Sequence, residues 1–199
     1  MRRAVPLLLL LGLLAPAADK DTGSRPLPPG FTALFNGKDL DGWHVMNKGQ
    51  FSVKENVIHL NKGSGWLRSD KEYKNFELRM EFRFVSKGAD SGIFVRANKD
   101  GKNWPSKAYQ VQTMDNNSIG QVFGASKSKR DNDKLKKAMK KTGEWQTYAI
   151  TVKGTQCDVV LNGELITAAE GLESRSGYLG LQGEGGILEF KNIRVKELK

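Results

Sequence analysis

The segment 76–85, FELRMEFRFV, decides the fold class, because apolar and charged residues alternate along it. Apolar side chains occupy the even positions from 76 to 84, and charged side chains occupy the odd positions from 77 to 83. A period of two is that of a β-strand with one buried face and one solvated face. The segment therefore predicts a strand that buries one face in a core.

Similar short segments follow along the chain, separated by turn residues. Strands are predicted at 91–97, 108–114, 145–154, 156–166, 178–182 and 187–198. Gly154 marks one turn, and Asn162-Gly163 is a strong hairpin signal. Turns at this spacing predict an all-β antiparallel sandwich or barrel. If one sheet is curved, the polar sides of its strands would line a groove on its outer face.

The two ends of the sequence differ in character. Residues 1–18 combine two arginines, a short leucine-rich run and small residues, which is the pattern of a secretory signal peptide. The apolar run is too short to span a membrane. Residues 19–29 predict a flexible lead-in, and residues 30–199 a single β-sandwich domain. We therefore expect a secreted or periplasmic protein without a membrane span.

The residues that usually bind metals are scarce. Cys157 is the only cysteine, which excludes an intramolecular disulfide and a cysteine-based zinc site. Its place in an apolar strand favours a small buried hydrophobe over a reactive thiol. His44 and His59 are the only histidines and lack neighbouring ligands. We expect no metal and no cofactor; a structural calcium ion stays open, although no acidic segment has calcium-loop spacing.

Positive charge is concentrated in one segment. The chain carries a formal net charge of +10, and residues 127–141, KSKRDNDKLKKAMKK, contain eight basic residues against two acidic ones. Such a segment can bind an anionic polysaccharide, or it can be a solvated loop or short surface helix. No aromatic residue is interleaved for base stacking, and export makes nucleic acid an improbable partner.

Five motifs in order resemble a known family. They are GFTALFNGKDLDGWHV (30–45), DSGIFVRA (90–97), YQVQTMD (109–115), GEWQTYAITVKGTQCDVVLNGELI (143–166) and GYLGLQGEGGILEFKNIRVKEL (177–198). Together they resemble the 3-keto-disaccharide hydrolase domain family. The resemblance implies a jelly-roll sandwich of the concanavalin A-like lectin/glucanase type, export, and action on or binding of oxidised or ordinary sugars. Many members have Glu at the position of Gln110 and His at the position of Glu184.

Cleavage of a 3-keto sugar requires a base for the hydrogen on C2 and a donor at the developing enolate oxygen. Glu184 shares its alternation with Gln182 and is flanked by glycines, which makes it a candidate base or a plain loop acid. Asp115 ends the YQVQTM strand and is the second candidate, with a turn-forming role as the alternative.

A second set of residues is predicted to hold the sugar. Amides both donate and accept, which suits hydroxyl groups, and loop tryptophans can stack on sugar rings. The predicted substrate-binding residues are Arg96, Gln110, Gln112, Gln182, Glu81, Trp66 and Trp104. Each has a structural alternative: a salt bridge for Arg96, solvated sheet surface for the glutamines and Glu81, and core packing for the tryptophans.

The sequence thus favours an exported carbohydrate-active hydrolase acting on 3-keto-glycosides, 3-keto-disaccharides or related glycans. A non-catalytic carbohydrate-binding module on the same fold is the first alternative. A matrix or adhesion domain that binds polyanions through residues 127–141 is the second.

Overall fold

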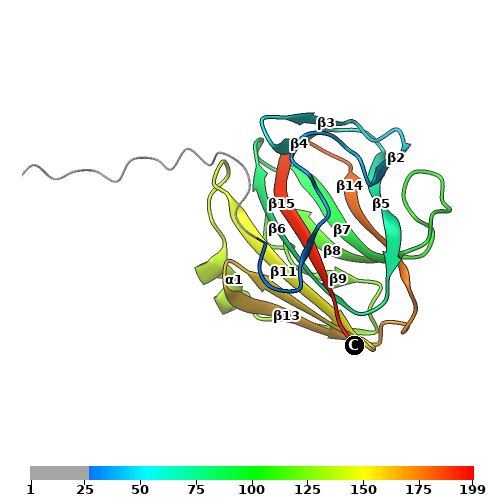
Figure 1. Cartoon of the computed structure of the whole chain (residues 1–199). Coiled ribbons are helices and arrows are strands. Elements are labelled where there is room, and N and C mark those ends of the chain that lie inside the picture. Colours follow the sequence, from blue (N-terminus) through cyan, green and yellow to red (C-terminus); the bar gives the residue numbers. More distant parts are fainter. Residues whose placement is uncertain (1–26) are drawn as a thin grey trace, which may run out of the picture.

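The computed structural model describes residues 27–199, which form two packed antiparallel sheets and one short helix (Figure 1). The nine-stranded sheet contains β1 (Thr32–Ala33), β3 (Phe51–Lys54), β4 (Val57–Asn61), β6 (Phe76–Phe84), β10 (Lys127–Arg130), β11 (Gln146–Lys153), β12 (Gln156–Leu161), β13 (Glu164–Glu170) and β15 (Ile187–Glu197). The six-stranded sheet contains β2 (Trp43–Asn47), β5 (Gly65–Tyr73), β7 (Asp90–Ala97), β8 (Tyr109–Met114), β9 (Val122–Phe123) and β14 (Gly177–Gly183). The predicted antiparallel sandwich is therefore confirmed.

The strand order brings distant parts of the chain together. In the six-stranded sheet it is β2-β5-β14-β7-β8-β9, so β14 lies between β5 and β7. In the nine-stranded sheet β15 lies beside β6, and β1 pairs with β15 at the side of this path. In each sheet a C-terminal strand, β14 or β15, therefore lies between strands from earlier parts of the chain, near the centre of the sheet.

The alternation along β6 gives one buried face and one half-buried face, as predicted. Its apolar side chains are buried between the sheets, and its charged side chains are half-buried on the outer face. Phe82 packs on Phe84 and on Tyr148 of β11, with ring centroids 5.6 and 4.6 Å apart. Cys157 is fully buried in the same core, and burial raises the pKa of its thiol to about 12. This supports the interpretation of Cys157 as a packing residue.

The predicted hairpin is present between β12 and β13. Asn162 and Gly163 both have positive φ, 49° and 90°, as a two-residue type I′ turn requires. Asn162 also donates from its side chain to the carbonyl of Ala138, so the turn is tied to the last residue of the short helix. Gly154, with φ 58°, turns the chain between β11 and β12 as expected.

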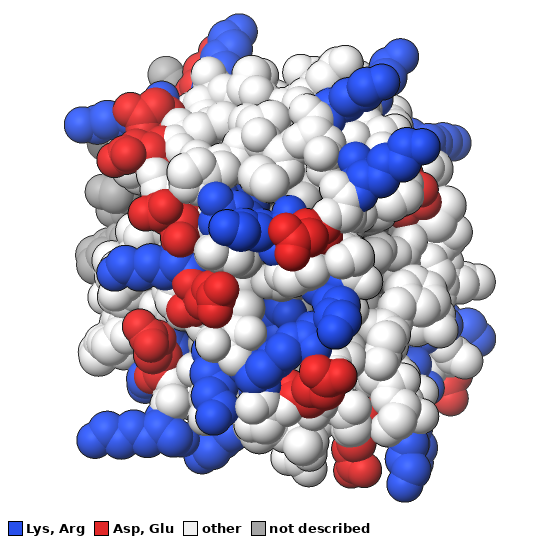
Figure 2. Space-filling view, turned by 90° about the vertical axis from the view of Figure 1, so that its right-hand side faces the viewer, with Lys and Arg blue, Asp and Glu red and all other residues white. Residues whose placement is uncertain are grey.

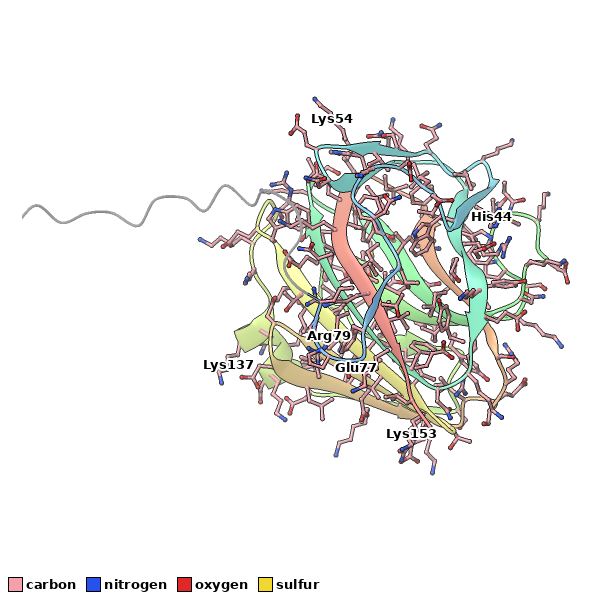
Figure 3. The ribbon with its side chains drawn as sticks, viewed as in Figure 1. His44, Lys54, Glu77, Arg79, Lys137 and Lys153 are labelled. Atoms are coloured by element: carbon pink, nitrogen blue, oxygen red, sulfur yellow. The ribbon has the colours of Figure 1, made fainter. Side chains whose placement is uncertain are left out.

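The lysine-rich segment forms an edge strand and a helix. β10 is the last strand of the nine-stranded sheet, and α1 (Asn132–Ala138) is capped by Asp131, whose side chain accepts from the amides of Asp133 and Lys134. Lys137 projects outward from α1 and pairs with Glu164 at 2.8 Å (Figure 3). Lysines on an edge strand discourage pairing with another chain, which accounts for part of the charge. Polyanion binding by this segment stays a prediction.

Residues 27–199 contain no helix that is both long and apolar enough to cross a membrane. The predicted signal peptide and most of the predicted lead-in lie outside the described residues.

Candidate functional site

A pocket of about 250 Å³ lies on the outer face of the six-stranded sheet, over β7, β8 and β9. Its lining consists of Phe94, Trp104, Pro105, Ser106, Ala108, Gln110, Phe123, Gly124 and Gln182. Three predicted sugar-binding residues, Gln110, Gln182 and Trp104, therefore meet at one pocket. Aromatic walls with a few polar groups are typical of a small-molecule site.

The loop between β7 and β8, which projects from the sandwich in Figure 1, contains Trp104. The base of the loop is closed by Asn98, which donates to the Ser106 hydroxyl and accepts from the Lys107 amide, both at 2.9 Å. The Trp104 indole donates to the carbonyl of Gly183 at 3.1 Å, and Asn47 donates to the carbonyl of Asn103 at 2.9 Å. These bonds attach the loop to β14 and β2, so Trp104 forms a fixed wall of the pocket.

Trp66 does not line the pocket. It is fully buried on the same side of the sheet, where it packs edge-on against Phe94 with ring centroids 5.7 Å apart. Gly180 makes room for it, because a Cβ atom there would lie 2.4 Å from the indole ring. The prediction that Trp66 contacts sugar directly is therefore corrected: Trp66 supports Phe94 from below.

Five polar side chains form a continuous hydrogen-bonded chain beside the pocket. Gln110 Nε2 donates to Gln112 Oε1 at 2.6 Å and to Gln182 Oε1 at 3.0 Å. Gln112 Nε2 donates to Asp90 Oδ1 at 2.8 Å, and Gln182 Nε2 donates to Glu184 Oε2 at 2.8 Å. We call Asp90, Gln112, Gln110, Gln182 and Glu184 the amide chain. A carboxylate stands at each end of it, and three amides lie between.

Neighbouring strands determine this arrangement. Gly92 pairs with Gln112 across β7 and β8, and Phe94 pairs with Gln110. A Cβ atom on Gly92 would lie 2.5 Å from Gln110 Nε2, so the missing side chain lets the Gln110 amide cross β7 toward Gln182. Gln112 and Gln182 are 8% and 4% exposed, so the interior links of the chain are shielded from water.

The two end carboxyls influence each other. Asp90 and Gly185 exchange backbone hydrogen bonds of 2.7 and 3.1 Å, which brings Glu184 beside Asp90. Burial raises the pKa of Asp90, against hydrogen bonds from Gln112 and the Ser91 amide that lower it. Burial and the charge of Asp90 raise the pKa of Glu184, whose carboxylate is partly shielded although the residue as a whole is exposed. A carboxyl with a raised pKa is suited to proton transfer nearer neutral pH.

Arg96 does not reach the pocket. A β-bulge occurs here, because Phe94 and Ala97 of β7 oppose Gly180 and Tyr178 of β14, and Arg96 itself has φ 51°. The bulge turns its side chain away from the pocket. The guanidinium is fully buried and donates to the carbonyls of Lys74, Gly154 and Glu173 at 2.6–2.9 Å.

The predicted role of Arg96 in sugar binding is therefore not supported by its position. The predicted alternative, a salt bridge to Asp90 or another acid, is absent among the partners described for its side chain. Asp90 is bound by Gln112 instead. Among the partners described for the Arg96 side chain there are backbone carbonyls and the amide oxygen of Asn75, but no carboxylate.

Asp115 and Glu81, like Glu184, are not among the residues that line the pocket, and neither belongs to the amide chain. Asp115 accepts from the Gly88 amide at 3.2 Å and from the Thr142 hydroxyl at 2.8 Å, so it ties three loops together. Glu81 lies in the other sheet, on β6, where it borders a separate hollow of about 290 Å³ and accepts from Asn192 at 2.9 Å. The predicted contact of Glu81 with the same ligand as Gln110 is corrected, because the two belong to different sheets.

Sequence reasoning missed Asp90, Phe94 and Phe123 as parts of the site. Phe94 lies two positions after Gly92 on the same strand face, so alternation alone could have placed it. Asp90 begins the same strand, two positions before Gly92, but its contact with Gln112 depends on pairing that the sequence does not display.

Charges are mixed on the right-hand side of Figure 1, where β2 and β5 lie. The face in Figure 2 shows Lys and Arg interspersed with Asp and Glu, without a patch of one sign. Figure 3 places Glu77 and Arg79, which are ion-paired at 2.6 Å, well away from His44, which bonds Asp70 at 2.9 Å. Within residues 27–199 no three side chains of the His, Cys, Asp and Glu type come together as metal ligands.

The fold is shared by proteins of carbohydrate chemistry. A β-glucanase of Bacillus licheniformis superposes with a TM-score of 0.57 at 13% identity, covering 85% of this chain and 97% of that one. A carbohydrate-binding module, CBM66 of Bacillus subtilis, gives 0.57 at 15% identity, covering 78% and 96%. A candidate glycosyl hydrolase of Parabacteroides distasonis gives 0.69 at 24% identity, covering 84% and 99%. The class is therefore the lectin/glucanase-like jelly-roll sandwich, as predicted.

The sequence narrows this class to one family. Residues 30–196 match the 3-keto-alpha-glucoside-1,2-lyase-like domain, and the chain belongs to that family. A curated relative, the 3-keto-disaccharide hydrolase of Bacteroides thetaiotaomicron, is 27% identical and covers 92% of this chain and 83% of its own length. The predicted family is confirmed, and the chain is a carbohydrate-acting domain of the glycosyl-hydrolase kind.

Proposed function

We propose that the chain is an exported hydrolase of 3-keto-glycosides. The observation that carries this proposal is the junction of a pocket for one sugar ring with a shielded amide chain that ends in Glu184. The family and the curated relative support the reaction class. The leucine-rich sequence at residues 1–18 supports export.

The amide chain offers complementary groups to a sugar. Gln110 uses its nitrogen twice within the chain, and no described residue donates to its oxygen, so Gln110 Oε1 can accept from a hydroxyl. Gln182 lines the pocket and uses its amide nitrogen for one bond, to Glu184, which leaves a second N–H. That N–H can donate to the oxygen of a keto group, where negative charge develops during the reaction.

The reaction follows from the acidity that a C3 carbonyl gives to C2. Glu184 takes the proton from C2, and the electron pair of the C–H bond forms the enolate. Collapse of the enolate restores the carbonyl, forms the C1–C2 double bond and expels the aglycone from C1 as an alkoxide, which takes a proton from water. Addition of the resulting hydroxide to C1 and return of the proton from Glu184 to C2 complete hydrolysis. Glu184 acts as base first and as acid last, so one carboxyl serves both steps.

Turnover of a 3-keto-disaccharide tests the proposal. Purified chain is expected to release the monosaccharide and the 3-keto monosaccharide, which chromatography resolves. The unoxidised disaccharide is expected to remain intact, because without the C3 carbonyl the C2 hydrogen is not acidic. Release from the unoxidised sugar at a similar rate, or no release from either, would contradict the proposed function.

A non-catalytic sugar-binding role is the second candidate. One observation favours it: neither Asp90 nor Glu184 is among the residues that line the pocket. Saturable binding of a 3-keto-disaccharide without any product would select this role. Binding without turnover that Glu184→Gln leaves unchanged would strengthen it further.

Trp104 gives a prediction that holds for either role. Replacing Trp104 by alanine removes a pocket wall, and affinity for a saccharide is expected to fall about tenfold, equal to about 1.4 kcal/mol. Trp145→Ala is the matched control, because Trp145 is a half-buried tryptophan that stacks with Arg83 and Lys191 and lies outside the pocket lining. Calorimetry with one saccharide measures both. Equal saccharide affinity in the two variants would contradict a role of Trp104 in binding.

A further inference from the structure

Asp90 has no task in the reaction described above, although it ends the amide chain opposite Glu184. Its backbone is held by the two bonds to Gly185, and its Oδ1 accepts from Gln112 Nε2 at 2.8 Å. Gln112 is 8% exposed, so this bond is shielded. A buried carboxylate-to-amide bond is stronger than a neutral one and is costly to lose.

The direction of hydrogen bonding along the chain is set by its ends. An ionised carboxylate only accepts, whereas an amide donates from nitrogen and accepts at oxygen. With an acceptor at both ends, one amide must donate in both directions. Gln110 is that amide, because its Nε2 serves both Gln112 Oε1 and Gln182 Oε1. Its oxygen is consequently turned out of the chain.

We propose that Asp90 is a positioning residue that, by accepting from Gln112, fixes the direction of all three amides and so keeps Gln110 Oε1 available to the ligand and Gln182 Nε2 on Glu184. The effect of Asp90 on Glu184 as a base rests on the proposed function, whereas the orientation of the three amides does not. Asp90 thereby acts on the base through three intervening side chains, in addition to acting through its charge.

Replacement of Asp90 by asparagine shows what the proposal implies. An asparagine amide can donate to Gln112 Oε1, and Gln112 can then turn its nitrogen toward Gln110. The Gln110 amide would then be rotated so that its oxygen takes the place of Nε2 between Gln112 and Gln182. That oxygen accepts from Gln112, but Gln182 Oε1 loses its donor. The donor to Glu184 would be weakened as a result, which raises the proton affinity of Glu184.

Loss of the Asp90 charge has the opposite effect, because a nearby negative charge raises the pKa of Glu184. The two effects can be separated by breaking the chain in the middle. In Gln110→Met the amide link is absent and only the charge effect of Asp90→Asn remains. The loops that border Glu184 and Asp90 carry Lys62, Lys87 and Asp115. These residues are the same in every variant, so their charges cancel in the comparison.

The experiment is a double-mutant cycle on the pKa of Glu184, followed by NMR of its side-chain carboxyl carbon as a function of pH. The variants are Asp90→Asn, Gln110→Met and the two combined, each checked by a thermal melt. We expect Asp90→Asn to lower the pKa of Glu184 less when the amide chain is intact than in the Gln110→Met background. The difference between the two shifts is expected to be about half to one pKa unit. Gln112→Met breaks the amide chain at another link. In that background Asp90→Asn is expected to shift the pKa of Glu184 by the same amount as in the Gln110→Met background.

Equal shifts in the two backgrounds would overturn the proposal, because they would leave charge as the only connection. This readout needs neither ligand nor turnover, so the inference and the proposed function can fail independently. If the protein hydrolyses 3-keto-disaccharides, Asp90→Asn is further expected to raise KM, and rescue by Asp90→Glu is expected to be partial because the carboxylate is restored but displaced.

Discussion

Replacing Arg96 by methionine is expected to lower the free energy of unfolding by about 3–5 kcal/mol. The guanidinium is fully buried and serves three backbone carbonyls, those of Lys74, Gly154 and Glu173. Methionine fills much of the volume but donates nothing, so these carbonyls would lose a charged donor without gaining water. Chemical denaturation, read as the midpoint with an unchanged slope, measures the loss.

The size of this effect follows from what Arg96 connects. Lys74 lies in the turn before β6, Gly154 in the turn after β11, and Glu173 in the segment before β14. Asn75 strengthens the same junction, because its side-chain oxygen accepts from the Gly154 amide at 3.0 Å. Arg96, near the end of the interior strand β7, therefore joins the β11–β12 turn to two connections that run between the sheets. Lys153 marks that end of the sandwich in Figure 3. Burial lowers the pKa of the Arg96 guanidinium, in keeping with an enclosed cation.

Two variants control for the change of side chain. Arg96→Lys keeps the charge, but a single ammonium group cannot span three carbonyls as a planar fork does, so we expect an intermediate loss. Arg79→Met removes an arginine that is 40% exposed and paired with Glu77, and a change within about 1 kcal/mol is expected. A loss no larger in Arg96→Met than in Arg79→Met would show that the buried contacts of Arg96 contribute little.

The fold could be predicted because its signals are local. The alternation of residues 76–84 and the turn at Asn162-Gly163 depend only on neighbours in sequence, and both are present in the structure. The helix within residues 127–141 is the short surface helix that the sequence left open beside a solvated loop. Strand order is not local, and the central places of β14 and β15 could not be derived from alternation.

The site was predictable only in part for the same reason. Gln110, Gln112 and Gln182 were identified as polar residues on strand faces, but their contact requires β14, β7 and β8 to be adjacent. The error on Arg96 has a different cause. Alternation places Arg96 on the face of Phe94, and one extra residue in β7 breaks that alternation between them. A bulge leaves no clear signal when the residue at positive φ is an arginine.

Replacing Glu184 by glutamine is expected to lower kcat on a 3-keto-disaccharide by about 10²–10⁴-fold, with KM changed little. Glutamine is nearly isosteric and keeps a partner for Gln182, but it cannot take a proton. The pH profile gives an independent prediction. A base must be ionised, and the pKa of Glu184 is raised above its ordinary 4.5. We therefore expect kcat/KM of the unmodified protein to rise with pH, with the midpoint of the rise above pH 4.5.

The comparison with Asp115→Asn decides between the two carboxylates that the sequence offers as base. Asp115 is occupied by the Gly88 amide and the Thr142 hydroxyl, whereas Glu184 is bound to Gln182 of the pocket lining, so replacement of Asp115 should cost less than Glu184→Gln. Glu72→Gln, an exposed acid on β5 in the same sheet, is the matched control and should leave kcat unchanged. If Glu184→Gln retained kcat within a few-fold while Asp115→Asn lost it, the base would be Asp115, and the amide chain would serve binding alone.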